Sequence, residues 1–260
     1  MVLDAAGNLY GTTFEGGTFT ICAGGCGTVF ELSPAENGRW TENILLNFGS
    51  GYTTTYTPDF GPLIIDGAGN LYGTSGGGGT YGLGTAFELS PTAGGVWTET
   101  TLHDFGASGD GVVPQGGLAL DASGNLYGTT NEGGTYGYGT AFQLTPAGGG
   151  SWTETIMHSF EQTSGGGDGT LPRANLIVDS AGNVYGTTGG GGTNIVGTVF
   201  ELRPGSGGSW TEKILHNFQD NGTDGFTPGA SLIFDSSGNL YGTTYYGGPK
   251  NGGTVFELTP

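Results

Sequence analysis

The chain has 260 residues, 59 of them glycine, and its 23 acidic and 5 basic side chains give a net charge of −18. So acidic a surface repels phosphate backbones and anionic lipids, which excludes nucleic acid as the expected partner. The sequence holds no apolar run of membrane-spanning length, so direct membrane insertion is not expected either.

One block of sequence recurs five times and sets the expected architecture. It has the form D-x-x-G-N-L/V-Y-G-T-T/S and begins at Asp4, Asp66, Asp121, Asp179 and Asp235. A period of this size indicates a repeat architecture. Because the repeat runs from end to end, we expect one domain, residues 1–260. Its units are roughly 1–48, 49–105, 106–160, 161–218 and 219–260.

Each unit divides into four short extended segments. Strand A is the apolar run before the Asp, strand B is L/V-Y-G-T-T, strand C is G-T-V/A-F-E/Q-L, and strand D runs from Trp to Phe, as in 210–218. Asp, Asn and Gly between A and B are typical of tight hairpins, and no helical apolar rhythm is present. Four antiparallel strands per unit predict an all-β, five-bladed β-propeller with strand A nearest the axis. An open β-solenoid is the alternative.

A glycine stands inside every strand B, as Gly128 does in the third unit. This position predicts that a neighbouring sheet approaches the strand closely there.

The count of strands is uneven, because only four D segments follow five A, B and C segments. One blade should therefore be short of a strand. We expect residues 1–3 to lie beside the blade of the fifth unit and so close the ring. The outer edge of residues 253–259 should be unpaired, and such an edge invites self-association.

Two cysteines enclose a short flexible spacer in Cys22-Ala-Gly-Gly-Cys26. A loop disulfide between Cys22 and Cys26 is favoured over a zinc site, which would need further ligands nearby, and over two free thiols. A disulfide would fit an oxidising compartment.

The blocks D-x-x-G-N-L-Y-G-T-T, G-G-T, G-T-V-F-E-L-T-P and W-T-E-x-I-L-H-x-F resemble, in this order, the GloVer tandem repeat family of bacterial proteins. The resemblance covers nearly the whole chain and implies an exported protein, either secreted or at the cell surface. The resemblance implies no catalytic residues. The hairpin between strands A and B is also similar to NHL-type propellers.

Residues that recur in every unit are expected to serve the repeated fold. His103, His158 and His216 share one position of strand D, which Leu46 occupies in the first unit, so packing is favoured over catalysis or metal binding. The glutamates after each Trp-Thr and in each strand C are assigned to structural hydrogen bonds. Asp110, Asp168 and Asp224 are assigned to turns, with cation binding as the alternative. The D-x-x-G-N set lacks the ligand spacing of a calcium loop, so no metal site or cofactor is expected, although Ca²⁺ stays open.

The loops between strands B and C are the most individual segments and should share one face of the propeller with the links between units. Aromatic rings there can stack on sugars, or can simply cover the end of the propeller. The candidate ligand-binding residues are Phe14, Phe19, Tyr81, Tyr136, Tyr138, Tyr245 and Tyr246.

These features favour an extracellular binding or assembly module, with glycan as the favoured ligand. One alternative is a carbohydrate-active hydrolase or lyase that uses a carboxylate pair from Glu15, Glu132 and Asp59 in the central funnel. A structural subunit that polymerises through its unpaired rim strand is the other. On balance the sequence argues against an enzyme.

Overall fold

A computed structural model describes residues 1–19, 22, 24–49, 61–162 and 167–260 of the chain. Apart from turns and two short 3-10 segments, η1 (Glu36–Gly38) and η2 (Ser206–Gly208), the regular structure in these residues consists of β-strands. The prediction of an all-β fold is therefore confirmed.

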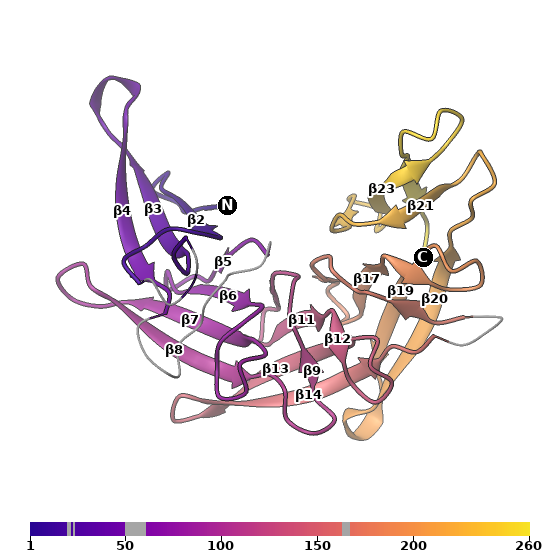
Figure 1. The fold of residues 1–260 in the computed structure, drawn as a ribbon, viewed down its shortest axis with the longest axis horizontal. Coiled ribbons are helices and arrows are strands. Elements are labelled where there is room, and N and C mark those ends of the chain that lie inside the picture. Colours follow the sequence, from indigo (N-terminus) through magenta and orange to yellow (C-terminus); the bar gives the residue numbers. More distant parts are fainter. Residues whose placement is uncertain (20–21, 23, 50–60, 163–166) are drawn as a thin grey trace.

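Five sheets stand around a common axis as the blades of a propeller (Figure 1). In the first four blades, four strands pair in chain order, and the long fourth strand lies on the outside. These blades comprise β1 (Val2–Leu3), β2 (Leu9–Thr13), β3 (Thr28–Pro34) and β4 (Trp40–Asn47); β5 (Ile64–Ile65), β6 (Leu71–Ser75), β7 (Thr85–Pro91) and β8 (Trp97–Asp104); β10 (Ala119–Leu120), β11 (Leu126–Thr130), β13 (Thr140–Gly148) and β14 (Ser151–Ser159); and β16 (Ile177–Val178), β17 (Val184–Thr188), β19 (Thr198–Pro204) and β20 (Trp210–Asn217).

The fifth blade is the short one. It contains β22 (Ile233–Phe234), β23 (Leu240–Gly247) and β24 (Val255–Leu258), and within the described chain β24 pairs only with β23. The prediction that one blade lacks a strand is confirmed.

The predicted closure of the ring is wrong. Strand β1 pairs with β2 of its own blade, with Val2 opposite Tyr10, and does not lie beside the fifth blade. The turn after Asp4 is the physical reason, because the backbone N–H of Asp4 donates to the carbonyl of Asn8 and folds β1 straight back onto β2. The blades therefore form an open arc, with the first and fifth blades on either side of an opening (Figure 1).

Short two-stranded ribbons tie the links before the third, fourth and fifth blades to the blade that follows. The link strand β9 (Gly111–Val112) pairs with β12 (Glu132–Gly133), and β15 (Gly169–Thr170) pairs with β18 (Gly190–Gly191). In the fifth blade, β21 (Gly225–Pro228) pairs with the end of β23. The links and the loops after the second strands thus lie on one face of the propeller, as predicted.

The hairpin between the first two strands of each blade is built on its aspartate. In the third blade, Asp121 accepts hydrogen bonds from the backbone N–H of Ser123 and Asn125, from the Asn125 side chain, and from the hydroxyl of Tyr127 at 2.9 Å. Partial burial alone would raise the pKa of Asp121, but these four donors outweigh it and lower that pKa. The turn role predicted for the D-x-x-G-N block is confirmed.

Replacing this aspartate should cost considerable stability. We expect Asp121→Ala to lower the free energy of unfolding by about 2–3 kcal/mol, because four donors lose a charged acceptor at once. Urea denaturation measures the change, and Asp220→Ala, which removes an exposed aspartate in a link, is the matched control. Equal losses in the two variants would contradict the capping role.

Four apolar clusters lie between neighbouring blades. We call the side of a blade that faces the next blade its forward face, and the opposite side its backward face. Between the second and third blades, Tyr72 and Phe105 on the forward side meet Trp152 and Phe142, with ring centroids 6.4 and 5.0 Å apart. The same contacts recur along the arc, so the core is divided among the junctions and is not concentrated in one place.

Candidate functional site

The most promising concave site lies where the links reach the axis. There a cavity of about 600 Å³, which we call the funnel, opens among segments that precede the first strands of the second to fifth blades. Its lining includes Gln115, Arg173, Asn175, Thr227, Ser231 and Tyr245. A cavity of this size with a few convergent polar groups is typical of small-molecule sites.

An aromatic ring forms one wall of the funnel. Tyr245 belongs to the end of β23 and is exposed, yet its ring lies directly against Gly229, where any Cβ atom would overlap it. Glycine at 229 therefore allows the ring to rest on the neighbouring link. Because the ring is held against the backbone of Gly229, Tyr245 presents a flat apolar surface to the cavity.

Polar side chains around the axis also connect the blades. The Asn175 side-chain oxygen accepts a hydrogen bond from the Gly117 N–H at 2.8 Å, and the backbone N–H of Asn175 donates to the Ser231 hydroxyl at 3.2 Å. Arg173, one of only five basic residues in the chain, donates from Nε to the side-chain oxygen of Asn131 at 2.9 Å. These contacts hold amide, hydroxyl and guanidinium groups in fixed positions at the funnel.

The links that shape the funnel adopt a strained backbone. Val113, Leu171 and Thr227 have φ of 57°, 58° and 55°, a left-handed conformation that is rare for residues with bulky or branched side chains. Hydrogen bonds maintain it, since the N–H of Thr227 donates to Val196 and the carbonyl of Leu171 accepts from Gly189. Such strain is often kept where a ligand site must be rigid.

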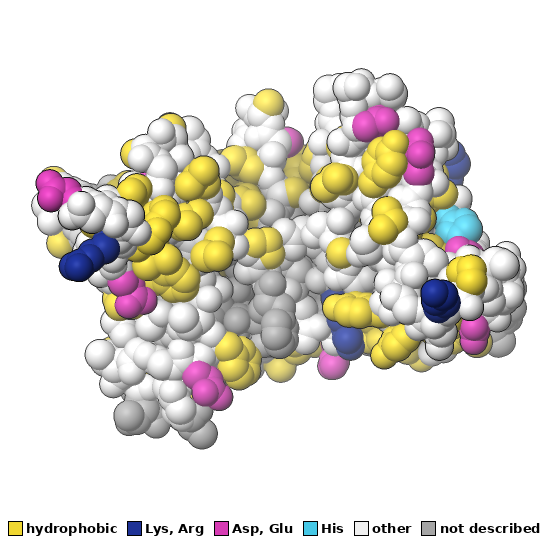
Figure 2. Space-filling model, turned by 90° about the horizontal axis from the view of Figure 1, so that it is seen from above, with side chains coloured by type: hydrophobic (Ala, Val, Ile, Leu, Met, Phe, Trp, Pro, Cys, Tyr) yellow, Lys and Arg dark blue, Asp and Glu magenta, His cyan; other side chains and the backbone are white. Residues whose placement is uncertain are grey.

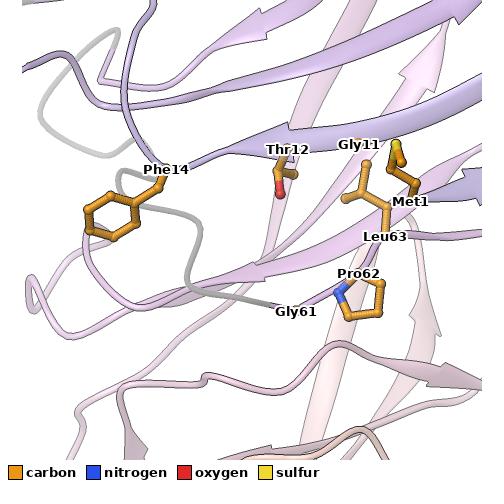
Figure 3. Close-up of a pocket in the computed structure, with 7 residues that line it drawn as sticks. All are labelled: Met1, Gly11, Thr12, Phe14, Gly61, Pro62 and Leu63. Carbon is orange, nitrogen blue, oxygen red and sulfur yellow. The ribbon is translucent and has the colours of Figure 1, made fainter. Parts of the chain in front are cut away.

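A second, smaller cavity of about 320 Å³ lies near the axis between the first two blades. Figure 3 shows Phe14 at one end of it and Met1 at the other, with Thr12 and Pro62 between them. Among the described residues of this lining the side chains are mainly apolar, and Thr12 supplies the one side-chain hydroxyl. It offers fewer groups for orienting a ligand than the funnel does.

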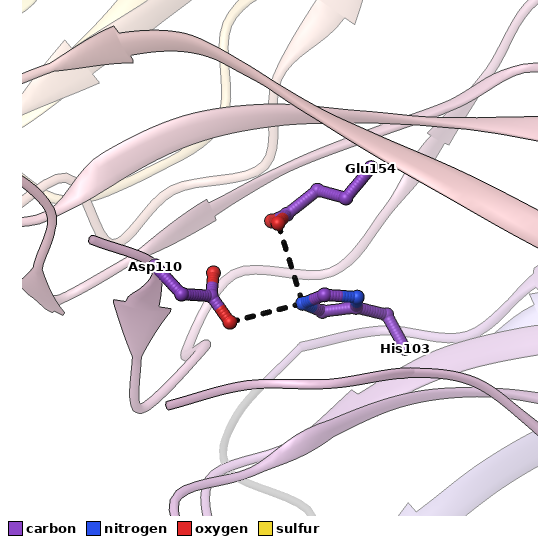
Figure 4. Close-up of side chains that lie close together, drawn as sticks. All are labelled: His103, Asp110 and Glu154. Atoms are coloured by element: carbon purple, nitrogen blue, oxygen red, sulfur yellow. Dashed lines mark hydrogen bonds and ion pairs between the residues drawn. The ribbon is translucent and has the colours of Figure 1, made fainter. Parts of the chain in front are cut away.

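Histidines and acids meet at the blade junctions. His103 of β8 lies with Nε2 3.0 Å from Asp110 Oδ2 in its own link and 3.4 Å from Glu154 Oε2 of the next blade (Figure 4). The next junction repeats the set with His158, Asp168 and Glu212. At the last junction His216 pairs with Asp224 at 3.1 Å.

Burial changes the pKa values of the two glutamates in these clusters and opposes the shift of His103. Burial raises the pKa of Glu154 and of Glu212 to about 7, against the opposing charge of the neighbouring imidazole. For His103 burial acts in the other direction, but the hydrogen bond to Asp110 and the charge of Glu154 outweigh it and raise the pKa. Glu154 and Glu212 therefore titrate near neutral pH.

Nitrogen and oxygen donors of the kind that bind Zn²⁺ converge in two of these clusters, with the candidate ligand atoms within 4.8 Å of one another. The same atoms already engage one another and the backbone. Asp110 also accepts hydrogen bonds from the N–H groups of Gly106 and Gly111. The turn role predicted for this aspartate is thereby confirmed.

The sequence match agrees with the repeated blades. The sequence model of the Gloeobacter/Verrucomicrobia repeat matches residues 1–177 and 122–260, which together span the chain. The chain belongs to this family. A comparison with curated proteins finds no match. The Gloeobacter/Verrucomicrobia repeat propeller is thus a binding or assembly module, and the predicted family is confirmed. The likeness to NHL-type propellers stays a prediction.

The repeat propeller does not gather the predicted aromatic residues into one site. Of the seven, Tyr245 lines the funnel and Phe14 lines the smaller cavity, whereas Tyr81 borders a separate groove beside His103. Tyr246 stacks on Phe226 with centroids 5.5 Å apart. The remaining three occupy loops of the first and third blades: Phe19, Tyr136 and Tyr138.

The predicted carboxylate pair is not assembled by the described residues. Glu15 lies in the first blade beside Gly24, and Glu132 lies in β12 of the third blade. Neither belongs to the described lining of the funnel. Asp59 falls outside the described residues.

Sequence reasoning treated the histidines and acids separately and so missed their clusters. The imidazole of His103 does pack on Phe105, with centroids 4.7 Å apart, as the packing assignment predicted. The structural role expected of Glu154 is met by one of its two oxygens: Oε2 lies 3.4 Å from His103 Nε2, whereas in the described chain Oε1 is buried without a hydrogen-bond partner. The sequence did hold one sign that these residues act together. The first unit lacks both the histidine in strand D and the Asp-Gly in the link that follows.

Cys22 and Cys26 form a disulfide with Cα atoms 5.1 Å apart. Disulfides are typical of proteins in oxidising, extracellular surroundings. Among the described residues, no helix is long and apolar enough to cross a membrane.

Proposed function

We propose that this protein is a secreted or cell-surface lectin-like module that binds a glycan in the funnel. One observation carries the proposal: the ring of Tyr245, the guanidinium of Arg173 and the amide of Asn175 line the same cavity. Sugars present apolar C–H faces that stack on aromatic rings, and hydroxyl groups that hydrogen-bond with amides and guanidinium groups. The net charge of −18 argues against a nucleic acid as the occupant.

The geometry favours a ligand that enters from the face of the links. Gln115, Thr227 and Ser231 add amide and hydroxyl groups around the same opening. Arg173 brings a planar cationic fork, which matches a carboxylate or a pair of hydroxyls. Because Tyr245 and Asn175 are held by neighbouring links, little order has to be gained on binding.

A glycan array with and without calcium tests the proposal. We expect wild-type protein to bind at least one class of glycan, and Tyr245→Ala to weaken that binding roughly 5- to 10-fold, the value of one lost stacking contact. Tyr136→Ala is the matched control, because this tyrosine is also exposed but lies away from the funnel. Silence of the wild-type protein on the array, or equal losses in both variants, would refute the proposal.

A further inference from the structure

The two ends of the arc expose surfaces that are buried at every internal junction. On the forward face, Val199 of the fourth blade is completely buried, whereas its repeat equivalent in the fifth blade, Val255, is 79% exposed. Ile177 is half-buried at the last junction, and its equivalent Ile233 is 65% exposed. The fifth blade thus presents the apolar half of a junction to solvent.

The first blade presents the other half. On its backward face Met1 is 74% exposed, whereas the equivalent Leu118 of the third blade is 1% exposed. Leu3, Trp40 and Ile44 are exposed on the same blade. Figure 2 looks onto the opening of the arc and shows hydrophobic side chains gathered over the left-hand, N-terminal part, with further ones on the right-hand part.

Both surfaces match a contact that the protein already makes. At the first three junctions the tyrosine of one blade meets the tryptophan of the next, as Tyr72 meets Trp152 and Tyr127 meets Trp210. In the described structure Trp40 of the first blade is 49% exposed, and Tyr241 holds in the fifth blade the position that Tyr72 holds in the second. The forward face of the fifth blade therefore complements the backward face of the first blade, and neither face complements another face of its own kind.

We propose that two or more copies of this chain associate head to tail, with the forward face of the fifth blade of one copy against the backward face of the first blade of the next. Such a contact is heterologous, so it extends into a chain of copies or closes into a larger ring. It is distinct from self-association through the edge of residues 253–259, because it uses sheet faces and not a strand edge.

The contact should be reversible. Strand D supplies Phe218 to the forward face of the fourth blade, and the described part of the fifth blade contains no counterpart. The area buried is therefore smaller than at an internal junction, and the net charge of −18 on each copy opposes association. A dissociation constant on the order of 10–100 µM in about 0.3 M NaCl is expected, since salt screens the repulsion.

Sedimentation velocity of the 260-residue chain between about 5 and 500 µM measures this association. We expect the wild-type protein to form concentration-dependent oligomers. Val255→Asp and Ile44→Asp should each remain monomeric, because each places a charge on one of the two faces. Val96→Asp introduces the same change at an exposed valine in a hairpin turn of the second blade and should associate like the wild type.

Mixing the two monomeric variants gives the sharpest test. Val255→Asp protein retains an intact first blade, and Ile44→Asp protein retains an intact fifth blade, so an equimolar mixture should form dimers and nothing larger. A wild-type protein that stays monomeric throughout, or a Val255→Asp protein that still dimerises through its first blade, overturns the proposal. A mixture that remains monomeric also overturns the proposal, provided that both variants show the wild-type thermal transition.

Discussion

Gly128→Ala is expected to lower the free energy of unfolding by about 3 kcal/mol, a large effect for one methyl group. A Cβ atom at this position in β11 would lie 2.5 Å from Cζ of Phe142 and 3.0 Å from a methyl carbon of Leu118. Both side chains are almost completely buried. Gly128 has no positive φ, so the backbone itself would accept alanine and the whole loss would come from overpacking.

The ring of Phe142 cannot move away from the added methyl group. Phe105 of the preceding blade packs on it with centroids 5.0 Å apart, in the apolar cluster that joins the second and third blades. The strain must then spread through the junction. We expect the melting temperature to fall by roughly 6–12 °C in differential scanning calorimetry, since about 1 kcal/mol corresponds to 2–4 °C in a domain of this size.

The first blade supplies a matched control. At Gly11 a Cβ atom would lie 2.7 Å from Phe30, the equivalent ring, but in the described structure Phe30 is only half-buried. The ring can swing toward solvent, so Gly11→Ala should cost less than about 1 kcal/mol. Similar losses at both positions would show that the glycine is needed for the strand itself and not for packing between blades.

The repeated features of the fold could be predicted because each is local to one unit. The Asp121 turn is specified within seven residues. Gly128 does mark a close approach, but the prediction of a neighbouring sheet is wrong, because the approaching side chains are those of Phe142 and Leu118 in its own blade. Ring closure could not be predicted in this way, because it depends on how far each junction rotates the next blade. No residue pattern within a unit specifies that angle. The expectation for residues 1–3 failed because the turn after Asp4 pairs them with β2 of their own blade.

The candidate site was harder to predict for the same reason. Gln115, Asn175 and Ser231 stand in links that the sequence marks only as connections, yet the propeller brings them to one funnel. Tyr245 was predicted from its loop, but aromatic residues in the other loops stay on their own blades. Glu154 belongs to a different unit from His103, so the distance between them is fixed only across a junction.

Stability should fall as the pH rises from about 5.5 to 8. Glu154 and Glu212 have folded pKa values raised from 4.5 to about 7, chiefly by burial, so the folded state binds these protons more tightly than the unfolded state does. The stability that they contribute is complete below pH 4.5 and is lost as the pH passes through 7. The raised pKa values of His103 and His158 act in the same direction.

At the acidic end other groups reverse the trend. The pKa of Asp110 is lowered, since hydrogen bonds from His103 and backbone N–H groups outweigh its burial, and the pKa of Asp121 is lowered by its hairpin. Their contribution is lost as the pH falls below the ordinary value of 3.8. The maximum of stability should therefore lie near pH 5, between the titration of the aspartates and that of the buried clusters.

Urea denaturation at pH 5.5, 6.5 and 8 measures the effect, which should amount to on the order of 2 kcal/mol for each buried glutamate between the two extremes. The double variant Glu154→Gln, Glu212→Gln removes both titrating carboxyls while keeping their shape, so its stability should change less than half as much over this range. Glu42→Gln alters the same strand position in the first blade, where the side chain is exposed, and should behave like the wild type. If the wild-type curve were flat from pH 5.5 to 8, the buried carboxyls would have to be ionised throughout, and the clusters would need a fixed positive partner to hold them.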